Sequence, residues 1–213
     1  TGKSVLEAAN PGDVTGWLSD TRMRIRACKA QLPDGGSELR VRDDERGAWR
    51  RLALWGPEES GGAHGFTPDD RGLYVESSLG SDTTRLLELD CATGAEKELF
   101  RHPDVDVGPV LTHPTGYALQ AVGFDDDRLH WRAFDPALGE DFEILARLAD
   151  GDFQLVSRDD ADRFWIVLFN SSHRPPRFHL YDRSTKRAEF LFSTRPELED
   201  RKLGRMEPVA IRS

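Results

Sequence analysis

Apolar and polar positions recur along the chain at a nearly constant interval. One template occurs four times: an apolar residue, Asp four residues later, Gly four after that and an aliphatic residue five further on. The copies begin at Leu39, Leu86, Trp131 and Phe178, and their Asp residues are 47, 45 and 47 positions apart. The last copy has Lys186 in place of Gly. A period of about 45 residues is typical of β-propeller blades.

Each copy of the template predicts a β-hairpin. Asp at the start of a turn hydrogen-bonds nearby backbone amides, and Gly supplies a positive φ. Upstream of every hairpin lie a strand-like run and, before it, a shorter apolar stretch that ends in Ser or Thr and a turn. The strand-like runs are Arg22–Ala30, Gly72–Ser78, Tyr117–Phe124 and Phe164–Phe169. The sequence therefore predicts an all-β fold, a propeller of four four-stranded blades. A β-sandwich has similar turn spacing but does not explain the period.

The repeat also predicts where the blades and the core lie. Complete blades are expected at residues 14–55, 63–101, 107–146 and 152–193, with 1–13 (strand Ser4–Ala9) as the outer strand of a truncated blade and 196–213 as a linker. Helix is expected to be nearly absent, since no long window keeps a helical apolar stripe free of Gly and Pro, and Pro196–Arg205 is the candidate. Six residues are expected in the core: Leu39, Val75, Leu86, Val122, Val167 and Phe178.

Composition excludes several classes of protein. The net charge of −9 argues against a nucleic-acid binder, and no apolar run approaches the roughly 20 residues of a membrane span. Two cysteines, Cys28 and Cys91, are too few for a disulfide framework or a thiolate zinc site. The chain opens without Met or an apolar signal segment, so we expect a cytoplasmic protein. Its basic residues are 24 Arg and 5 Lys, which suggests a bacterial source.

Several patterns could carry chemistry, but each has a simpler interpretation. The loop Gly56–Gly65 with Glu58 and Glu59 is either a mobile entrance loop or a solvated linker. The alternating strand Arg22–Arg26 could steer peptide carboxylates, although ion pairing between blades explains it as well. The acidic clusters lack the spacing of a calcium loop and fit surface turns better; they are Asp104/Asp106, Asp125–Asp127 and Asp159/Asp160/Asp162. The six histidines are scattered, and no serine lies in Gly-x-Ser-x-Gly. We therefore expect no catalytic, cofactor-binding or metal-binding residue in this chain.

The order of the weak motifs resembles the propeller of prolyl oligopeptidase family peptidases, in the branch of acylaminoacyl-peptidases and dipeptidyl aminopeptidases. The segment from Leu191 to Ile211 is similar to the connection from the last blade to the hydrolase domain. The other segments that carry the resemblance are Asn10–Trp17, Gly72–Ser78, Asp82–Leu86, Trp165–Val167 and His179–Arg183.

The resemblance implies a seven- or eight-bladed propeller that caps an α/β-hydrolase domain with a Ser-Asp-His triad, and this chain ends before that domain would begin. We therefore expect a non-catalytic propeller fragment that gates a serine peptidase. Its expected partners are the hydrolase domain of the same parent, the parent's peptide substrates and, for the fragment alone, a second copy in a homodimer. The alternative is a stand-alone small propeller that binds a protein or a ligand.

Overall fold

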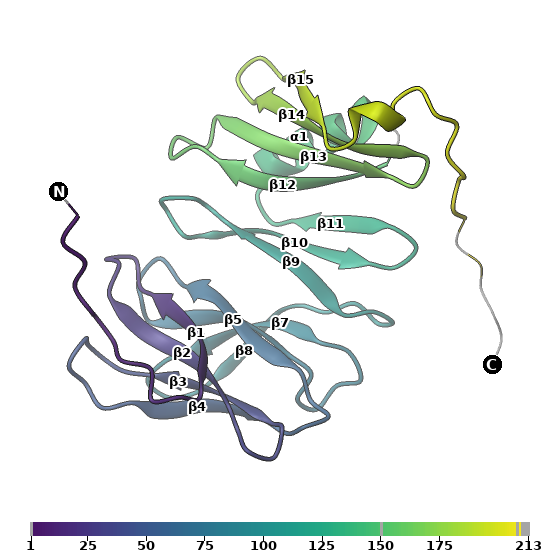
Figure 1. Cartoon of the computed structure of the whole chain (residues 1–213). Helices are drawn as coiled ribbons and strands as arrows, with labels where there is room; N and C mark the ends of the chain where they lie inside the picture. Colours follow the sequence, from purple (N-terminus) through teal and green to yellow (C-terminus); the bar gives the residue numbers. More distant parts are fainter. Residues whose placement is uncertain (1, 150, 208, 210–213) are drawn as a thin grey trace. The chain divides into compact units, whose positions relative to one another are not determined.

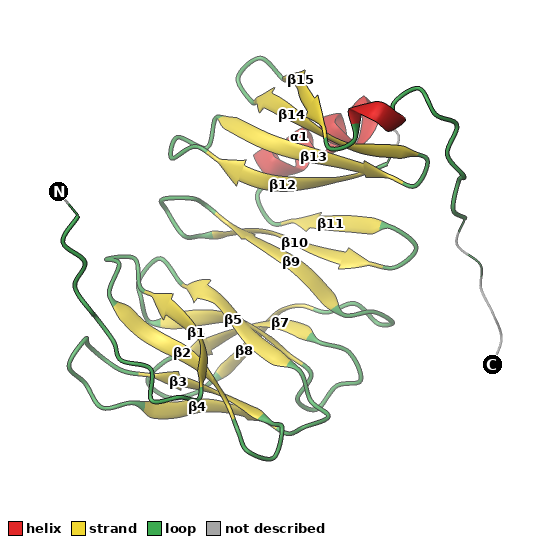
Figure 2. Ribbon diagram, in the orientation of Figure 1, coloured by secondary structure: helices red, strands yellow, loops and turns green. Residues whose placement is uncertain are grey.

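The structure of the chain is a computed structural model that describes residues 2–149, 151–207 and 209. Within these residues the chain forms four antiparallel sheets and one α-helix (Figures 1 and 2). The first sheet consists of β1 (Val14–Ser19), β2 (Ile25–Gln31), β3 (Ser37–Val41) and β4 (Arg50–Trp55). The second consists of β5 (Gly61–Phe66), β6 (Gly72–Ser77), β7 (Arg85–Asp90) and β8 (Glu96–Phe100). The predicted all-β class is confirmed.

The third sheet differs from the other three. It consists of β9 (Val107–Thr112), β10 (Leu119–Asp125) and β11 (Leu129–Ala133), and helix α1 (Pro136–Leu148) follows where a fourth strand was expected. The fourth sheet again has four strands in chain order, namely β12 (Asp152–Arg158), β13 (Phe164–Ser171), β14 (Arg174–Asp182) and β15 (Arg187–Ser193). A 3-10 turn, η1 (Pro196–Leu198), lies after it, in the segment proposed as a helix.

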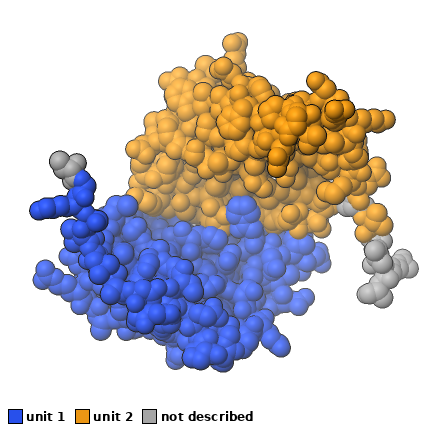
Figure 3. Space-filling view, in the orientation of Figure 1, with its two compact units in different colours: residues 1–109 blue, residues 110–213 orange. Residues whose placement is uncertain are grey.

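The chain divides into two compact units, residues 1–109 and 110–213, and the division falls within β9 (Figure 3). The first unit has a core shared by its two four-stranded sheets, which includes Leu39, Trp55, Leu73 and Val75. In the second unit, residues of the third sheet, α1 and the fourth sheet form another core. No helix of the described residues is long and apolar enough to cross a membrane.

The template residues form the turns that their chemistry predicts. Asp90 accepts hydrogen bonds from the amides of Ala92 and Thr93, and Gly94 has a φ of 73°. Lys186, which breaks the Gly column, still has a φ of 55°. The turn therefore imposes its left-handed backbone on a residue that lacks glycine's freedom.

Helix α1 corrects the prediction of a β-hairpin at the third copy of the template. Asp135, the template Asp, caps the helix by accepting a hydrogen bond from the amide of Ala137 at 2.9 Å, and Pro136 occupies the first turn. Proline is well placed there because the first amides of a helix have no intrahelical partner. The helix buries Leu138, Phe142 and Leu145, which share one face.

The two ends of the chain also differ from the prediction. Residues 2–13 contain no strand, although Ser4–Ala9 was expected to form one. A strand needs a neighbour for its backbone hydrogen bonds, and the first sheet begins at β1 in the described residues. Thr1 and, in the expected linker, residues 208 and 210–213 lie outside the described residues.

Five of the six predicted core residues are fully buried, and Phe178 is half-buried. The register of the last sheet explains the exception. Val167 pairs with His179, so these residues lie on the inner face, and Phe178 points to the opposite, outer face.

Candidate functional site

An acidic hollow in the first unit is one candidate site. It has a volume of about 420 Å³ and lies between the loop before β5 and the loop before β7. Its lining consists of carboxylates, hydroxyls and one glycine, from Glu58, Glu59, Ser60, Ser78, Gly80, Ser81, Asp82, Thr84 and Asp106. The Glu58–Glu59 pair singled out in the sequence thus borders a real depression. Chemically, such a lining suits a cationic group better than an anion.

Much of this lining is already engaged in holding the loops. Glu59 accepts a hydrogen bond from the Gly56 amide at 2.7 Å. Asp106 likewise accepts one from the Thr84 amide at 2.6 Å. The expected glycine-rich loop is also shorter than predicted, because Gly61–Phe66 form β5. The carboxylates thus fix local backbone, and no group of three or more His, Cys, Asp or Glu in the described residues could hold a metal ion.

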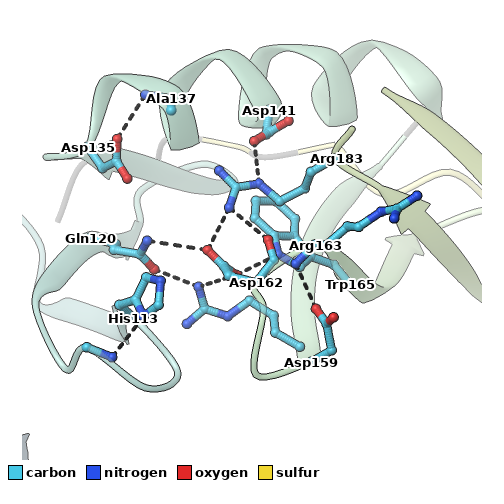
Figure 4. Close-up of polar contacts among 12 residues, drawn as sticks. His113, Gln120, Asp135, Ala137, Asp141, Asp159, Asp162, Arg163, Trp165 and Arg183 are labelled. Carbon is cyan, nitrogen blue, oxygen red and sulfur yellow. Dashed lines mark hydrogen bonds and ion pairs between the residues drawn. The ribbon is translucent and has the colours of Figure 1, made fainter. Parts of the chain in front are cut away.

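A buried polar network in the second unit is the other candidate (Figure 4). Its first centre is Asp162, in the turn before β13, which is only 4% exposed. One carboxylate oxygen accepts hydrogen bonds from the indole of Trp165 at 2.8 Å and from Arg158 at 3.2 Å. The other accepts one from Arg183 at 2.6 Å. Asp162 was predicted to be a surface turn residue, and that prediction is wrong because its carboxylate is buried and is bound by three side-chain donors.

The second centre of the network is Asp141 of α1, which is fully buried. It accepts hydrogen bonds from Tyr181 and Arg183, both at 2.8 Å, and forms an ion pair with Lys186. Burial and the hydrogen bond to this carboxylate raise the pKa of Tyr181 well above its usual value. The Tyr181 hydroxyl therefore stays protonated and acts as a donor.

Gln120 and Arg158 extend the network to the third sheet. Arg158 donates to the Gln120 side chain at 2.6 Å and to the Thr112 carbonyl. Burial lowers the pKa of Arg158, and Asp162 opposes that effect. Two carboxylates thus face three cations, and each of these charged groups has a partner within the network. The arrangement fastens α1 and two sheets together, and it offers no free group for a ligand.

The remaining candidates take local roles. Arg24 pairs with Asp20 at 2.5 Å. That pair lies within one turn of the first sheet. Arg26 donates to the carbonyl of Asp70 at 3.3 Å and lies over the Phe66 ring, so it joins the first two sheets. The strand itself begins at Ile25, later than expected.

The histidines and hydroxyls do not assemble a catalytic arrangement in the part of the chain that the structure describes. His64 lies 3.2 Å from Glu76, and His130 lies 2.9 Å from Asp127. Ser171 contacts His173 at 2.9 Å, but the two residues are neighbours in one hairpin turn. No serine of the sequence lies in Gly-x-Ser-x-Gly, the motif of a nucleophile elbow.

Comparison with known proteins gives the family context. No protein-family model matches the chain. Dipeptidyl aminopeptidase BIII of Pseudoxanthomonas mexicana is 31% identical over 215 aligned positions, which cover 100% of this chain and 31% of the relative. Dipeptidyl peptidase family member 6 of Caenorhabditis elegans is 31% identical over 194 positions, covering 86% of this chain and 26% of the relative.

The chain is related to prolyl oligopeptidase family peptidases. The resemblance expected from the sequence is confirmed, and the chain spans about a third or less of the length of these relatives.

Solved structures confirm the propeller fold. TolB from Acinetobacter baumannii matches 88% of this chain with a TM-score of 0.58 at 12% identity, and this chain covers 45% of it. Prolyl oligopeptidase B from Galerina marginata matches 82% of this chain with a TM-score of 0.55 at 10% identity, and 26% of it is covered. At these identities the matches establish the architecture alone.

Proposed function

We propose that this chain is the non-catalytic propeller part of a longer prolyl oligopeptidase-type serine peptidase. In that protein it would restrict access of peptide substrates to an α/β-hydrolase domain elsewhere in the same chain. One observation carries the proposal: the dipeptidyl aminopeptidase aligns with the whole of this chain, but the alignment covers less than a third of the length of that relative. The remainder of such a protein has ample length for a catalytic domain.

The chemistry of the described residues supports a scaffold role. The buried charges in the second unit are paired with one another, and the acidic hollow of the first unit uses carboxylates to brace loops. A rigid frame of this kind can shape an entrance without touching the reacting atoms. The hydrolysis itself would need a nucleophile, a base and an orienting acid from the hydrolase domain.

The first experiment separates the propeller from the chemistry. The purified chain should not hydrolyse an aminoacyl nitroanilide above background, whereas the longer gene product should. Hydrolysis by the chain alone that a serine-directed phosphonate abolishes would overturn the non-catalytic role. The gene supplies an independent check, since a Gly-x-Ser-x-Gly domain after Ser213 supports the proposal. A stop codon there would instead favour a stand-alone binding module.

The second experiment addresses gating. The longer protein is given peptides of increasing length that share the same cleaved residues, and kcat/KM is measured for each. Gating predicts that the rate falls steeply once a peptide is too large to pass the propeller. Equal rates for short peptides and for an unfolded protein would refute gating while leaving the family relation intact.

A further inference from the structure

Strand β15 forms a free edge of the fourth sheet (Figure 2). It pairs with β14 on one side and is the last strand in the order of that sheet. The backbone N–H and C=O groups of its other side therefore have no strand partner within the described residues. Such an edge is a template for a further strand unless charged side chains or a covering element prevent the pairing.

The outer strands of the first two sheets carry charge where β15 carries an aromatic ring. The residue before the template's aliphatic position is Arg51 in β4 and Glu98 in β8, but it is Phe190 in β15. All three strands have a register shift at this place, so a bulge does not distinguish β15. An antiparallel pair of β8 strands about Lys97 would place Glu96 opposite Glu98, which is unfavourable. Charge thus discourages pairing at those edges, whereas Phe190 is uncharged and 53% exposed.

Arg187 and Glu189 give β15 two charges of opposite sign. Both residues are exposed, and they share one face of the strand because they lie two positions apart. Neither forms an ion pair or a side-chain hydrogen bond within the part of the chain that the structure describes. In β8, by contrast, Glu98 pairs with Arg101 at 2.8 Å. The two charges of β15 are therefore available to another chain.

We propose that β15 pairs with β15 of a second copy of the protein, antiparallel and about a two-fold axis at Ala188. In this register Arg187 lies directly opposite Glu189 of the second copy, and the symmetry repeats that pair. Phe190 lies diagonally across from Ala188 of the second copy, on the other face of the strand. Arg187 to Phe190 pair with β14 without a register shift, so this segment offers a regular edge. The pairing joins the two four-stranded sheets into one.

The charge pattern favours a second copy over an unrelated strand. The sequence Arg-x-Glu is its own complement in an antiparallel pair, because the residue two positions after Arg carries the opposite charge. An unrelated strand satisfies the backbone groups of β15 but needs the same spacing of charges to satisfy Arg187 and Glu189. The segment has one positive and one negative charge, so it is locally neutral although the chain has a net charge of −9.

The edge stays open in a longer protein as well. The blades of a propeller meet face to face, so further blades would not cover the outer edge of β15. Two-fold dimers are also the commonest oligomers of soluble proteins. The inference goes beyond the proposed function and does not depend on it, since edge pairing requires no peptidase activity.

Charge exchange tests the pairing in the full-length gene product, with the dimer Kd measured by sedimentation. Arg187→Glu sets like charges opposite each other at both symmetric positions and should raise the Kd at least about tenfold. The double variant Arg187→Glu/Glu189→Arg restores opposite charges and should return the Kd to within about threefold of the parent value. The matched control is Arg132→Glu in β11, which alters an exposed arginine by the same charge and should leave the Kd unchanged.

Four outcomes would overturn the proposal. The first is a full-length protein that is monomeric at micromolar concentration. The second is a dimer that Arg187→Glu leaves intact, because the contact would then lie elsewhere. The third is equal weakening by Arg132→Glu, which would indicate a general effect of charge. The fourth is a double variant that remains as weak as Arg187→Glu, which would exclude the pairing of Arg187 with Glu189.

Two further measurements keep the test decisive. Circular dichroism identifies any variant that fails to fold, and Glu189→Arg creates the same like-charge contact with the opposite sign if Arg187→Glu is lost. The molecular mass is measured independently of peptidase activity. An inactive protein that forms the dimer therefore contradicts the proposed function alone.

Discussion

Gly61 should be the least replaceable glycine of the first unit, because the indole of Trp55 lies directly over it. A Cβ added at residue 61 would lie 1.9 Å from Cε2 and 2.2 Å from Nε1 of that indole. Trp55 is fully buried, and its Nε1 donates to the Ser77 hydroxyl at 2.9 Å. Gly61→Ala therefore forces the ring away by roughly 1.5 Å, the difference between 1.9 Å and an ordinary contact of about 3.4 Å.

The cost follows from two effects. Overpacking a well-packed core costs about 1–3 kcal/mol. A displaced indole also leaves its buried N–H without a partner, which adds about 1–3 kcal/mol. We expect Gly61→Ala to lower the free energy of unfolding by about 2–6 kcal/mol, the sum of the two effects. For a chain of this size each kcal/mol corresponds to about 2–4 °C in Tm.

Urea denaturation followed by far-UV circular dichroism measures this loss. The matched control is Gly65→Ala in the same strand, where an added Cβ meets nothing within 4 Å. That variant should stay within about 0.5 kcal/mol of the parent. Trp55→Leu in the Gly61→Ala background should cost less than it does in the parent, because the clash is then already relieved. If Gly61→Ala were as stable as Gly65→Ala, the indole would not lie over residue 61 and the reasoning would fail.

Three further predictions concern single side chains. Asp162→Ala should cost about 3–5 kcal/mol because it leaves Arg158, whose side chain is 9% exposed, without its carboxylate partner. Asp127→Ala removes only an exposed pair and should leave the urea midpoint nearly unchanged, and equal shifts of the midpoint would argue against the buried network. Leu39→Ala should cost about 2–5 kcal/mol and its half-buried counterpart Phe178→Ala about 1–2 kcal/mol, and the opposite order in thermal melts would contradict the assigned faces. Arg177 of β14 lowers the pKa of Glu199 from 4.5 to about 2 by hydrogen bonding. The stabilisation of η1 by this ion pair is therefore present above pH 4.5 and is lost as the pH falls toward 2. Unchanged NMR shifts of residues 196–199 over that pH range would refute this prediction.

The repeat made most of the fold predictable, and Asp135 shows where the prediction failed. The same residue type opens the turns at Asp90 and Asp182, so the template predicts a hairpin. The signal for a helix was the dipeptide Asp135-Pro136, a cap followed by proline in the first turn. The rule that a helix contains no Gly or Pro is too strict here. Gly139 costs a helix only about 1 kcal/mol relative to alanine, and a Cβ added there would lie 3.6 Å from Cβ of Ala133, an ordinary contact.

The candidate sites were less predictable because they depend on contacts between distant residues. Asp141 and Arg183 are 42 positions apart, and nothing local to either residue indicates that they meet. Glu58 and Asp82 both line the acidic hollow, and nothing in the sequence around either residue indicates that they share it. Phe178 is the converse case. Its strand was predicted correctly, but the pairing of Val167 with His179 places Phe178 on the outer face of the sheet, where it is only half-buried.

The strictly sequential order of strands in every described sheet has a consequence for how the chain reaches its structure. Each strand pairs with its immediate neighbour in the chain, from β1 through β4 and again from β12 through β15. Closing such short loops costs little entropy, so each meander can form before any sheet meets another. The chain should therefore fold faster than a β-sandwich of equal length, in which pairing waits for distant segments. Its slowest steps should be the docking of completed sheets, about 45 residues apart in sequence, and not the formation of the strands themselves.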